Sequence, residues 1–70
     1  MRIQLNGEPR ELTGPLSVSA LLVELGIDAR VVAVEVNRTV IRRNRHAETL
    51  VTAGAEVEIV AFVGGGAALS

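Results

Sequence analysis

Three consecutive glycines, Gly64 to Gly66, follow an apolar run that ends at Phe62-Val63. Because glycine has no Cβ, such a segment is thin and flexible, so it could thread a narrow channel and present a carboxylate to another protein's active site. A glycine run near a terminus can also be an ordinary frayed end. The strand predicted over residues 57–62 favours the first interpretation, because it would hold the root of the glycine segment rigid.

The other reactive residue types do not form a recognisable catalytic or metal site. The chain has no cysteine, which excludes a thiolate nucleophile, a disulfide framework and a zinc–thiolate site. Its single histidine, His46, has no partner at metal-ligand spacing, and we predict that it is a solvated turn residue. Glu56 and Glu58 are predicted to be surface charges on a strand. No phosphate-binding loop or dinucleotide fingerprint is present, so we expect no catalytic residue, no metal ligand and no cofactor.

All seven basic residues are arginines, and four of them lie within eight positions: Arg38, Arg42, Arg43 and Arg45. Arginine pairs bidentately with carboxylates, so the cluster has two interpretations. It is either a docking patch for an acidic surface or a solvated face around a turn, which is the commoner origin of a charge block. No aromatic residue is interleaved with these arginines and the net charge is −1, so the sequence does not predict binding to nucleic acid.

Length and composition predict one small folded domain. Seventy residues suffice for one domain, and a 49% apolar content excludes disorder as the main state. The apolar runs are far shorter than the ~20 residues of a membrane-spanning helix, and the first residues lack the apolar region of a signal peptide. The absence of cysteine fits a reducing compartment. We therefore expect a cytoplasmic protein that does not enter the membrane.

The first residues predict a β-hairpin. Residues 1–5 alternate between apolar and polar side chains, as a half-buried strand does. Asn6-Gly7 is a strong hairpin signal, because a type I′ turn needs positive φ at both positions. The returning strand, residues 8–13, contains Pro9 and therefore belongs at an edge of the sheet.

A single helix is predicted after the hairpin. Ser17 or Ser19 can cap its start, and Gly26 followed by Ile27 can end it in a Schellman motif. Its apolar stripe has helical spacing and consists of Val18, Leu21, Leu22 and Leu25.

The second half of the chain predicts three strands, at residues 31–36, 39–42 and 57–62. The β-branched run of the first is expected to be buried on much of both faces. A turn is predicted at residues 37–38, a single-turn or irregular connection at 44–48, and another turn at 52–55. Leu50, just before that last turn, is predicted to be a core residue.

The last strand is predicted to present an apolar patch. Alternation places Glu58, Val60 and Phe62 on one face, and Glu58 marks this face as solvent-facing. Val60 and Phe62, with Val63, are therefore predicted to bind a partner at the root of the tail. The alternative is that Phe62 folds over the end of the sheet as a core residue.

The order of these elements predicts an α+β protein with a β-grasp, or ubiquitin-like, fold. One helix has to cover one face of a mixed sheet of four to five strands, because two layers are the minimum that buries both apolar surfaces. The first and last strands are expected to lie side by side and parallel at the centre of the sheet. Residues 1–63 would form the domain, and residues 64–70 a flexible glycine-rich tail.

From Met1 to Gly66 the chain resembles the ThiS family, the sulfur carrier proteins of thiamine biosynthesis. Members of that family end at the glycine pair, whereas Ala67 to Ser70 follow it here. The resemblance is carried by Asn6-Gly7, Leu21-Leu22, Val34-Glu35-Val36-Asn37, Val40-Ile41, Leu50, Gly54, Val57-Glu58-Ile59-Val60 and Phe62-Val63-Gly64-Gly65-Gly66.

The resemblance implies a carrier and not an enzyme. A partner similar to ThiF would use ATP to adenylate the carboxylate of Gly66, while Gly64 and Gly65 thread the partner's site. Sulfur from a persulfide would then displace AMP and leave a thiocarboxylate, which a thiazole synthase similar to ThiG would use. The carrier itself would hold no cofactor.

Two alternatives stay open at this point. A carrier similar to MoaD, which serves molybdopterin synthesis, or a carrier of another thioacid pathway would share the fold and the glycine tail. A binding module that uses its sheet face and is never activated is the other alternative, and Ala67 to Ser70 support it. A sulfur carrier would need a tail-trimming protease to expose Gly66.

Overall fold

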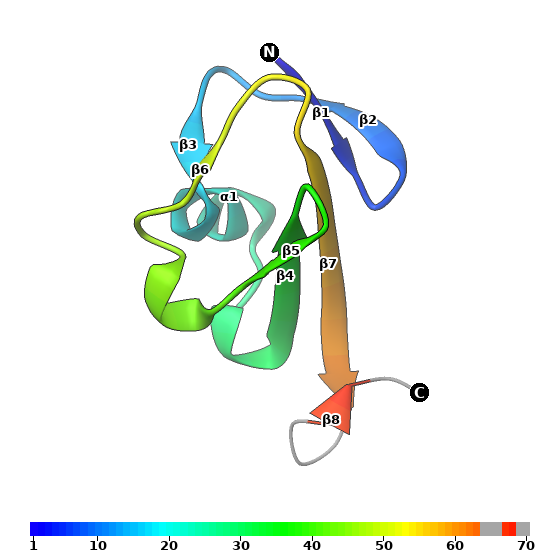
Figure 1. The fold of residues 1–70 in the computed structure, drawn as a ribbon, viewed down its shortest axis with the longest axis vertical. Coiled ribbons are helices and arrows are strands. Elements are labelled where there is room, and N and C mark those ends of the chain that lie inside the picture. The colour runs from blue at the N-terminus through cyan, green and yellow to red at the C-terminus, as the bar shows by residue number, and fades with distance from the viewer. Residues whose placement is uncertain (64–66, 69–70) are drawn as a thin grey trace.

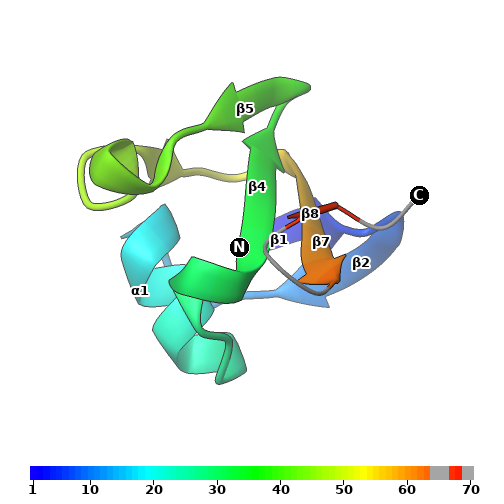
Figure 2. The same cartoon turned by 90° about the horizontal axis from the view of Figure 1, so that it is seen from below.

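A mixed β-sheet packs on one α-helix in the computed structural model, which describes residues 1–63 and 67–68 (Figure 1). The sheet order is β2-β1-β7-β4-β5, and β8 also pairs with β7. Figure 2 shows α1 on one side of this sheet. The elements are β1 (Arg2–Leu5), β2 (Glu8–Glu11), β3 (Leu16–Ser17), α1 (Val18–Leu25), η1 (Ala29–Val31), β4 (Val32–Val36), β5 (Thr39–Ile41), η2 (Arg43–Arg45), β6 (Leu50–Val51), β7 (Glu56–Val63) and β8 (Ala67–Ala68).

The topology confirms the predicted β-grasp fold. β1 and β2 form an antiparallel hairpin, and its turn residues have positive φ values, 50° at Asn6 and 81° at Gly7. β1 then pairs in parallel with β7, with Leu5 opposite Val57, so the first and last strands of the β-grasp core are neighbours. β4 pairs antiparallel with β7 on its other side and with β5. The strand that leads to the glycine run therefore lies at the centre of the sheet.

The helix has the predicted caps. The Ser17 hydroxyl accepts a hydrogen bond from the Ala20 amide at 3.0 Å. At the other end Gly26 takes the left-handed conformation, with φ 72°, and the Ile27 amide donates to the Leu22 carbonyl at 2.9 Å. The Gly26 amide also donates to the Val23 carbonyl at 3.0 Å, and these two C-terminal bonds form the Schellman motif. The buried core combines residues of the helix, the strands and the connections between them: Ile3, Leu12, Val18, Leu21, Leu22, Val32, Val34, Val36, Val51, Ala55 and Val57.

The prediction that Leu50 is a core residue is wrong. Its side chain is 61% exposed, whereas the neighbouring Val51 is fully buried. β6 pairs with the short strand β3, with Leu16 opposite Val51 and Ser17 opposite Leu50. Successive residues of a strand point to opposite faces, so only one residue of the Leu50-Val51 pair can face the core. The sequence pattern does not show which one.

The prediction that His46 is a solvated turn residue is also wrong, because it is only 3% exposed. Its Nε2 lies 3.1 Å from the Ile41 carbonyl oxygen. A carbonyl can only accept, so Nε2 carries the proton. The Ser19 amide donates to the His46 carbonyl at 3.2 Å, which ties the connection between β5 and β6 to the start of α1. This tertiary contact buries the ring.

The glycine run, Gly64 to Gly66, lies outside the described residues. Beyond it, β8 pairs antiparallel with the end of β7, with Val63 opposite Ala67 and Phe62 opposite Ala68. The predicted flexibility of residues 64–70 stays a prediction.

Candidate partner-docking site

β7 directs the chain toward the glycine run. It extends through the centre of the sheet, and Figure 1 shows its C-terminal end reaching past α1 and β4. β4 accompanies it only as far as Ala61, which lies opposite Val32. Phe62 and Val63 are therefore the root of the tail, at the end of the strand that the rest of the sheet holds in place.

As far as Val60, the two faces of β7 differ as the alternation predicts, but Ala61, expected on the same face as Val57 and Ile59, is exposed. Val57 is fully buried and Ile59 packs against the core, whereas Glu58 is exposed and Val60 is 42% exposed. Phe62 is half-buried. It therefore lies between the two alternatives that the sequence left open, as neither a core residue nor a fully exposed one.

A shallow hollow of about 290 Å³ brings Phe62 together with part of the arginine cluster. Val40 and Ala33 contribute apolar surface from β5 and β4, and Val40 is 64% exposed. The remaining residues that line the hollow are Ala29, Arg30, Val32, Ile41, Arg42, Arg43 and His46.

The structure divides the arginine cluster into two groups. Arg38 lies 3.6 Å from a Glu56 carboxylate oxygen and Arg45 lies 3.7 Å from one of Glu48. Arg42 and Arg43 line the hollow beside Phe62, and within the described part of the chain neither forms an ion pair. These two guanidinium groups are available to a carboxylate on a partner.

Arg30 is a third cation at the hollow, and the sequence analysis did not single it out. Its guanidinium lies 2.8 Å from a carboxylate oxygen of Asp28. Hydrogen bonds from the Arg30 side chain and from its amide lower the pKa of Asp28 to about 2. Arg30 lies in η1, far from the arginine cluster in sequence, so neither spacing nor charge pattern indicates that it belongs with Arg42 and Arg43.

The lining of the hollow therefore combines apolar and cationic side chains. Such a surface can dock a partner that presents an apolar side chain flanked by carboxylates, because apolar burial supplies affinity and complementary charge supplies orientation. Among residues 1–63 and 67–68 there is no group of three His, Cys, Asp or Glu side chains that could hold a metal ion. In the same part of the chain no helix is long and apolar enough to cross a membrane.

Comparison with known proteins assigns the family. The family model described as the ThiS family matches residues 3–66, which is nearly the whole chain and ends at Gly66. The chain belongs to the ThiS family. This assignment supports a sulfur carrier role.

A solved ThiS structure has the same fold. The crystal structure of the thiamine biosynthesis protein ThiS from Geobacter metallireducens superposes with a TM-score of 0.84 at 38% identity, covering 94% of this chain and 100% of that one. The uncharacterized protein ycf40 of Porphyra purpurea is 38% identical over 64 residues, which cover 91% of this chain and 90% of ycf40.

Two longer relatives contain a segment similar to this chain. A thiazole synthase of Paramagnetospirillum magneticum is 46% identical over 66 residues, and one of Magnetococcus marinus is 36% identical over 66 residues. In both cases the match covers 94% of this ThiS-family chain but only 20% of the thiazole synthase. The chain thus spans about one fifth of these two relatives.

Proposed function

We propose that this ThiS-family chain carries sulfur as a thiocarboxylate on Gly66 and donates it for thiazole formation in thiamine biosynthesis. The observation that carries the proposal is the family match, which ends at Gly66, three residues beyond the end of the central strand β7. The carrier itself performs no catalysis.

The chemistry explains why a glycine terminus suits this role. A carboxylate is a poor electrophile until one of its oxygens becomes a leaving group. A ThiF-like partner supplies that group when the Gly66 carboxylate attacks the α-phosphate of ATP and pyrophosphate leaves. A persulfide sulfur then attacks the acyl carbon, AMP departs, and a thiol cleaves the resulting acyl disulfide to leave the thiocarboxylate. Glycine offers the least steric hindrance to both attacks, and ATP is bound by the partner.

The glycine segment also suits a carrier that has to dissociate. Three extended residues span about 10 Å, which is enough to pass from the surface of the domain into a partner's site. Ordering each residue costs about 1–2 kcal/mol. This cost weakens each complex, so that the carrier can leave the activating enzyme and reach the next one.

The thiazole synthase relatives favour the thiamine pathway over a MoaD-like role. In these relatives a segment similar to this carrier is joined to a longer chain named as a thiazole synthase. Joining a carrier to the enzyme that it serves raises its effective concentration at that enzyme. We infer that this carrier serves a ThiG-like thiazole synthase.

The pathway can be tested with a chain of residues 1–66 prepared as its thiocarboxylate. Each reaction also contains the substrate that accepts the sulfur. We expect a ThiG-like thiazole synthase to transfer the sulfur to that substrate and return the carrier to its carboxylate, as intact-mass analysis would show. The matched reaction contains the molybdopterin-forming enzyme instead, and we expect the thiocarboxylate to survive there. Consumption only in the molybdopterin reaction would replace the thiazole assignment by the MoaD-like one.

The docking surface predicts a salt-dependent loss of binding when its charge is reversed. In the double variant Arg42→Glu, Arg43→Glu, we expect affinity for the ThiF-like enzyme to fall by about 10–100-fold at low salt, because like charges then face the partner's carboxylates. The effect should shrink at ~1 M salt, where the Debye length is ~3 Å. Titration calorimetry at both salt concentrations measures this.

Arg10→Glu is the control, since it makes the same type of charge change on the exposed edge strand β2, at the far side of the sheet from β5. We expect it to change affinity less than twofold, as surface substitutions outside an interface usually do. If Arg10→Glu lowered the affinity as much as each substitution of the double variant does, only the net charge would matter. The docking assignment would then be wrong.

A further inference from the structure

Two similar turns lie on either side of β7, and in each an asparagine carboxamide continues the main-chain pairing of the sheet. Asn6 and Asn37 have nearly equal positive φ values, 50° and 51°. Each is followed by a second residue with positive φ, Gly7 at 81° and Arg38 at 69°. Both asparagines donate their own amide to a carbonyl of β7 and accept from an amide of β7 through the side-chain oxygen.

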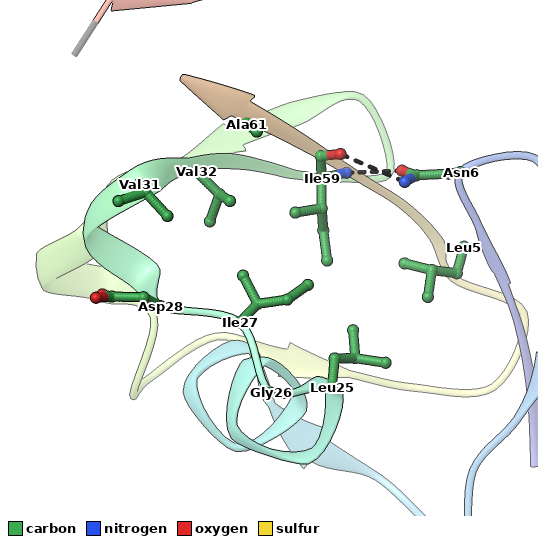
Figure 3. Close-up of a pocket in the computed structure, with 10 residues that line it drawn as sticks. All are labelled: Leu5, Asn6, Leu25, Gly26, Ile27, Asp28, Val31, Val32, Ile59 and Ala61. Atoms are coloured by element: carbon green, nitrogen blue, oxygen red, sulfur yellow. Dashed lines mark hydrogen bonds between the residues drawn. The ribbon is translucent and has the colours of Figure 1, made fainter. Parts of the chain in front are cut away.

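Asn6 extends the parallel pairing between β1 and β7. Its amide donates to the Val57 carbonyl at 2.9 Å. In a parallel ladder the carbonyl of the same residue would accept from Ile59, but at Asn6 the chain turns away. The side chain replaces that carbonyl: Oδ1 accepts from the Ile59 amide at 2.8 Å, and Nδ2 donates to the Ile59 carbonyl at 3.3 Å (Figure 3). The carboxamide thus acts as one further peptide unit of the ladder.

Asn37 has the equivalent role at the other end of β7. Its amide donates to the Glu56 carbonyl at 2.7 Å, and its Oδ1 accepts from the Glu56 amide at 2.9 Å. Glu56 is the first residue of the strand, whereas Ile59 lies further toward the tail. The two asparagines therefore differ mainly in which part of β7 they hold.

The part of β7 near Ile59 has an open groove beneath it. This groove of about 510 Å³ lies between the end of α1 and the sheet, and Leu25, Ile27 and Ile59 point into it (Figure 3). Because the groove is open, core packing supports this part of the strand less than it supports Val57, which is fully buried. β4 pairs with one edge of this part of β7 as far as Ala61, and the carboxamide of Asn6, at the edge of the groove, attaches its other edge.

We infer that Asn6 is a positioning residue, whose carboxamide fixes the direction in which the last residues of β7 leave the sheet and so aims the root of the tail at the activating enzyme. The inference rests on the proposed function. Hydrogen bonds with fixed geometry suit this purpose, since a small misplacement of a reacting group lowers a rate strongly.

The test compares Asn6→Gly with its matched control Asn37→Gly in chains of residues 1–66. Glycine adopts positive φ without strain, so both turns persist and each variant loses only its carboxamide. We expect kcat/KM for adenylation, measured by pyrophosphate release, to fall about tenfold or more for Asn6→Gly and less than twofold for Asn37→Gly. Asn6→Asp keeps the acceptor for the Ile59 amide and should recover part of the loss.

A second readout does not depend on activation. Residual dipolar couplings report the orientation of the amide bonds of residues 60–63, and we expect these to change in Asn6→Gly but not in Asn37→Gly. If kcat/KM fell equally in Asn6→Gly and Asn37→Gly, and only as far as their losses of thermal stability explain, the inference would be overturned. If the wild-type chain is not adenylated, the proposed function fails. In that case, unchanged couplings in Asn6→Gly would overturn the positioning role as well.

Discussion

Leu21→Ala is expected to lower the free energy of unfolding by about 2–5 kcal/mol, which is the usual cost of truncating a buried leucine. Leu21 is fully buried beneath the sheet. A chain of this length has a total stability of only about 4–10 kcal/mol, so this one change removes a large share of it. Urea denaturation followed by circular dichroism measures the loss.

Val23→Ala, in the same helix, is the control. Val23 is 79% exposed, and alanine is the better helix former, so we expect its free energy of unfolding to stay within about 0.5 kcal/mol of the wild-type value. If Val23→Ala lowered the free energy of unfolding as much as Leu21→Ala does, α1 would not pack on the sheet through the face that contains Leu21.

Local sequence signals predicted those parts of the fold that depend on neighbouring residues. Asn6-Gly7 predicted a turn because few residues adopt two successive positive φ values, and the structure has that turn. Ser17 and Gly26 predicted the ends of the helix for equally local reasons, and both caps are present. The β-grasp topology then follows, since one helix and a hairpin leave few ways to bury both apolar faces.

Burial that depends on distant partners could not be predicted. Leu50 and Val51 are adjacent and both apolar, and only the pairing of β6 with β3 determines that Val51 faces inward. His46 is buried because its connection is bonded to the start of α1 at Ser19. No periodicity near His46 indicates that contact.

The candidate site was predicted in parts but not as a whole. Alternation along β7 indicated the face that carries Val60 and Phe62, and the arginine cluster was visible in the sequence. Phe62, Arg42 and Arg43 line one hollow with Arg30 because of how β4, β5 and η1 pack, and no local pattern shows this packing. The Asn6 contact with Ile59 joins residues 53 positions apart, which a single sequence cannot show.

Removing residues 67–70 is expected to have an all-or-none effect on sulfur loading. Only a free carboxylate can attack ATP, and in a chain of residues 1–70 the free carboxylate belongs to Ser70 and not to Gly66. The antiparallel pairing of Ala67–Ala68 with the end of β7 also directs these residues back along the strand. We therefore propose that a protease trims the chain before activation.

The most direct measurement is intact-mass analysis after incubation with a ThiF-like enzyme, ATP and a persulfide sulfur source. Three chains are compared: residues 1–66, residues 1–70, and residues 1–66 with a C-terminal amide, which has no carboxylate to activate. The account predicts that one oxygen is replaced by one sulfur in the first chain, and that the other two keep their mass. Sulfur on the chain of residues 1–70 would contradict the trimming requirement, and no sulfur on any chain would contradict the carrier function itself.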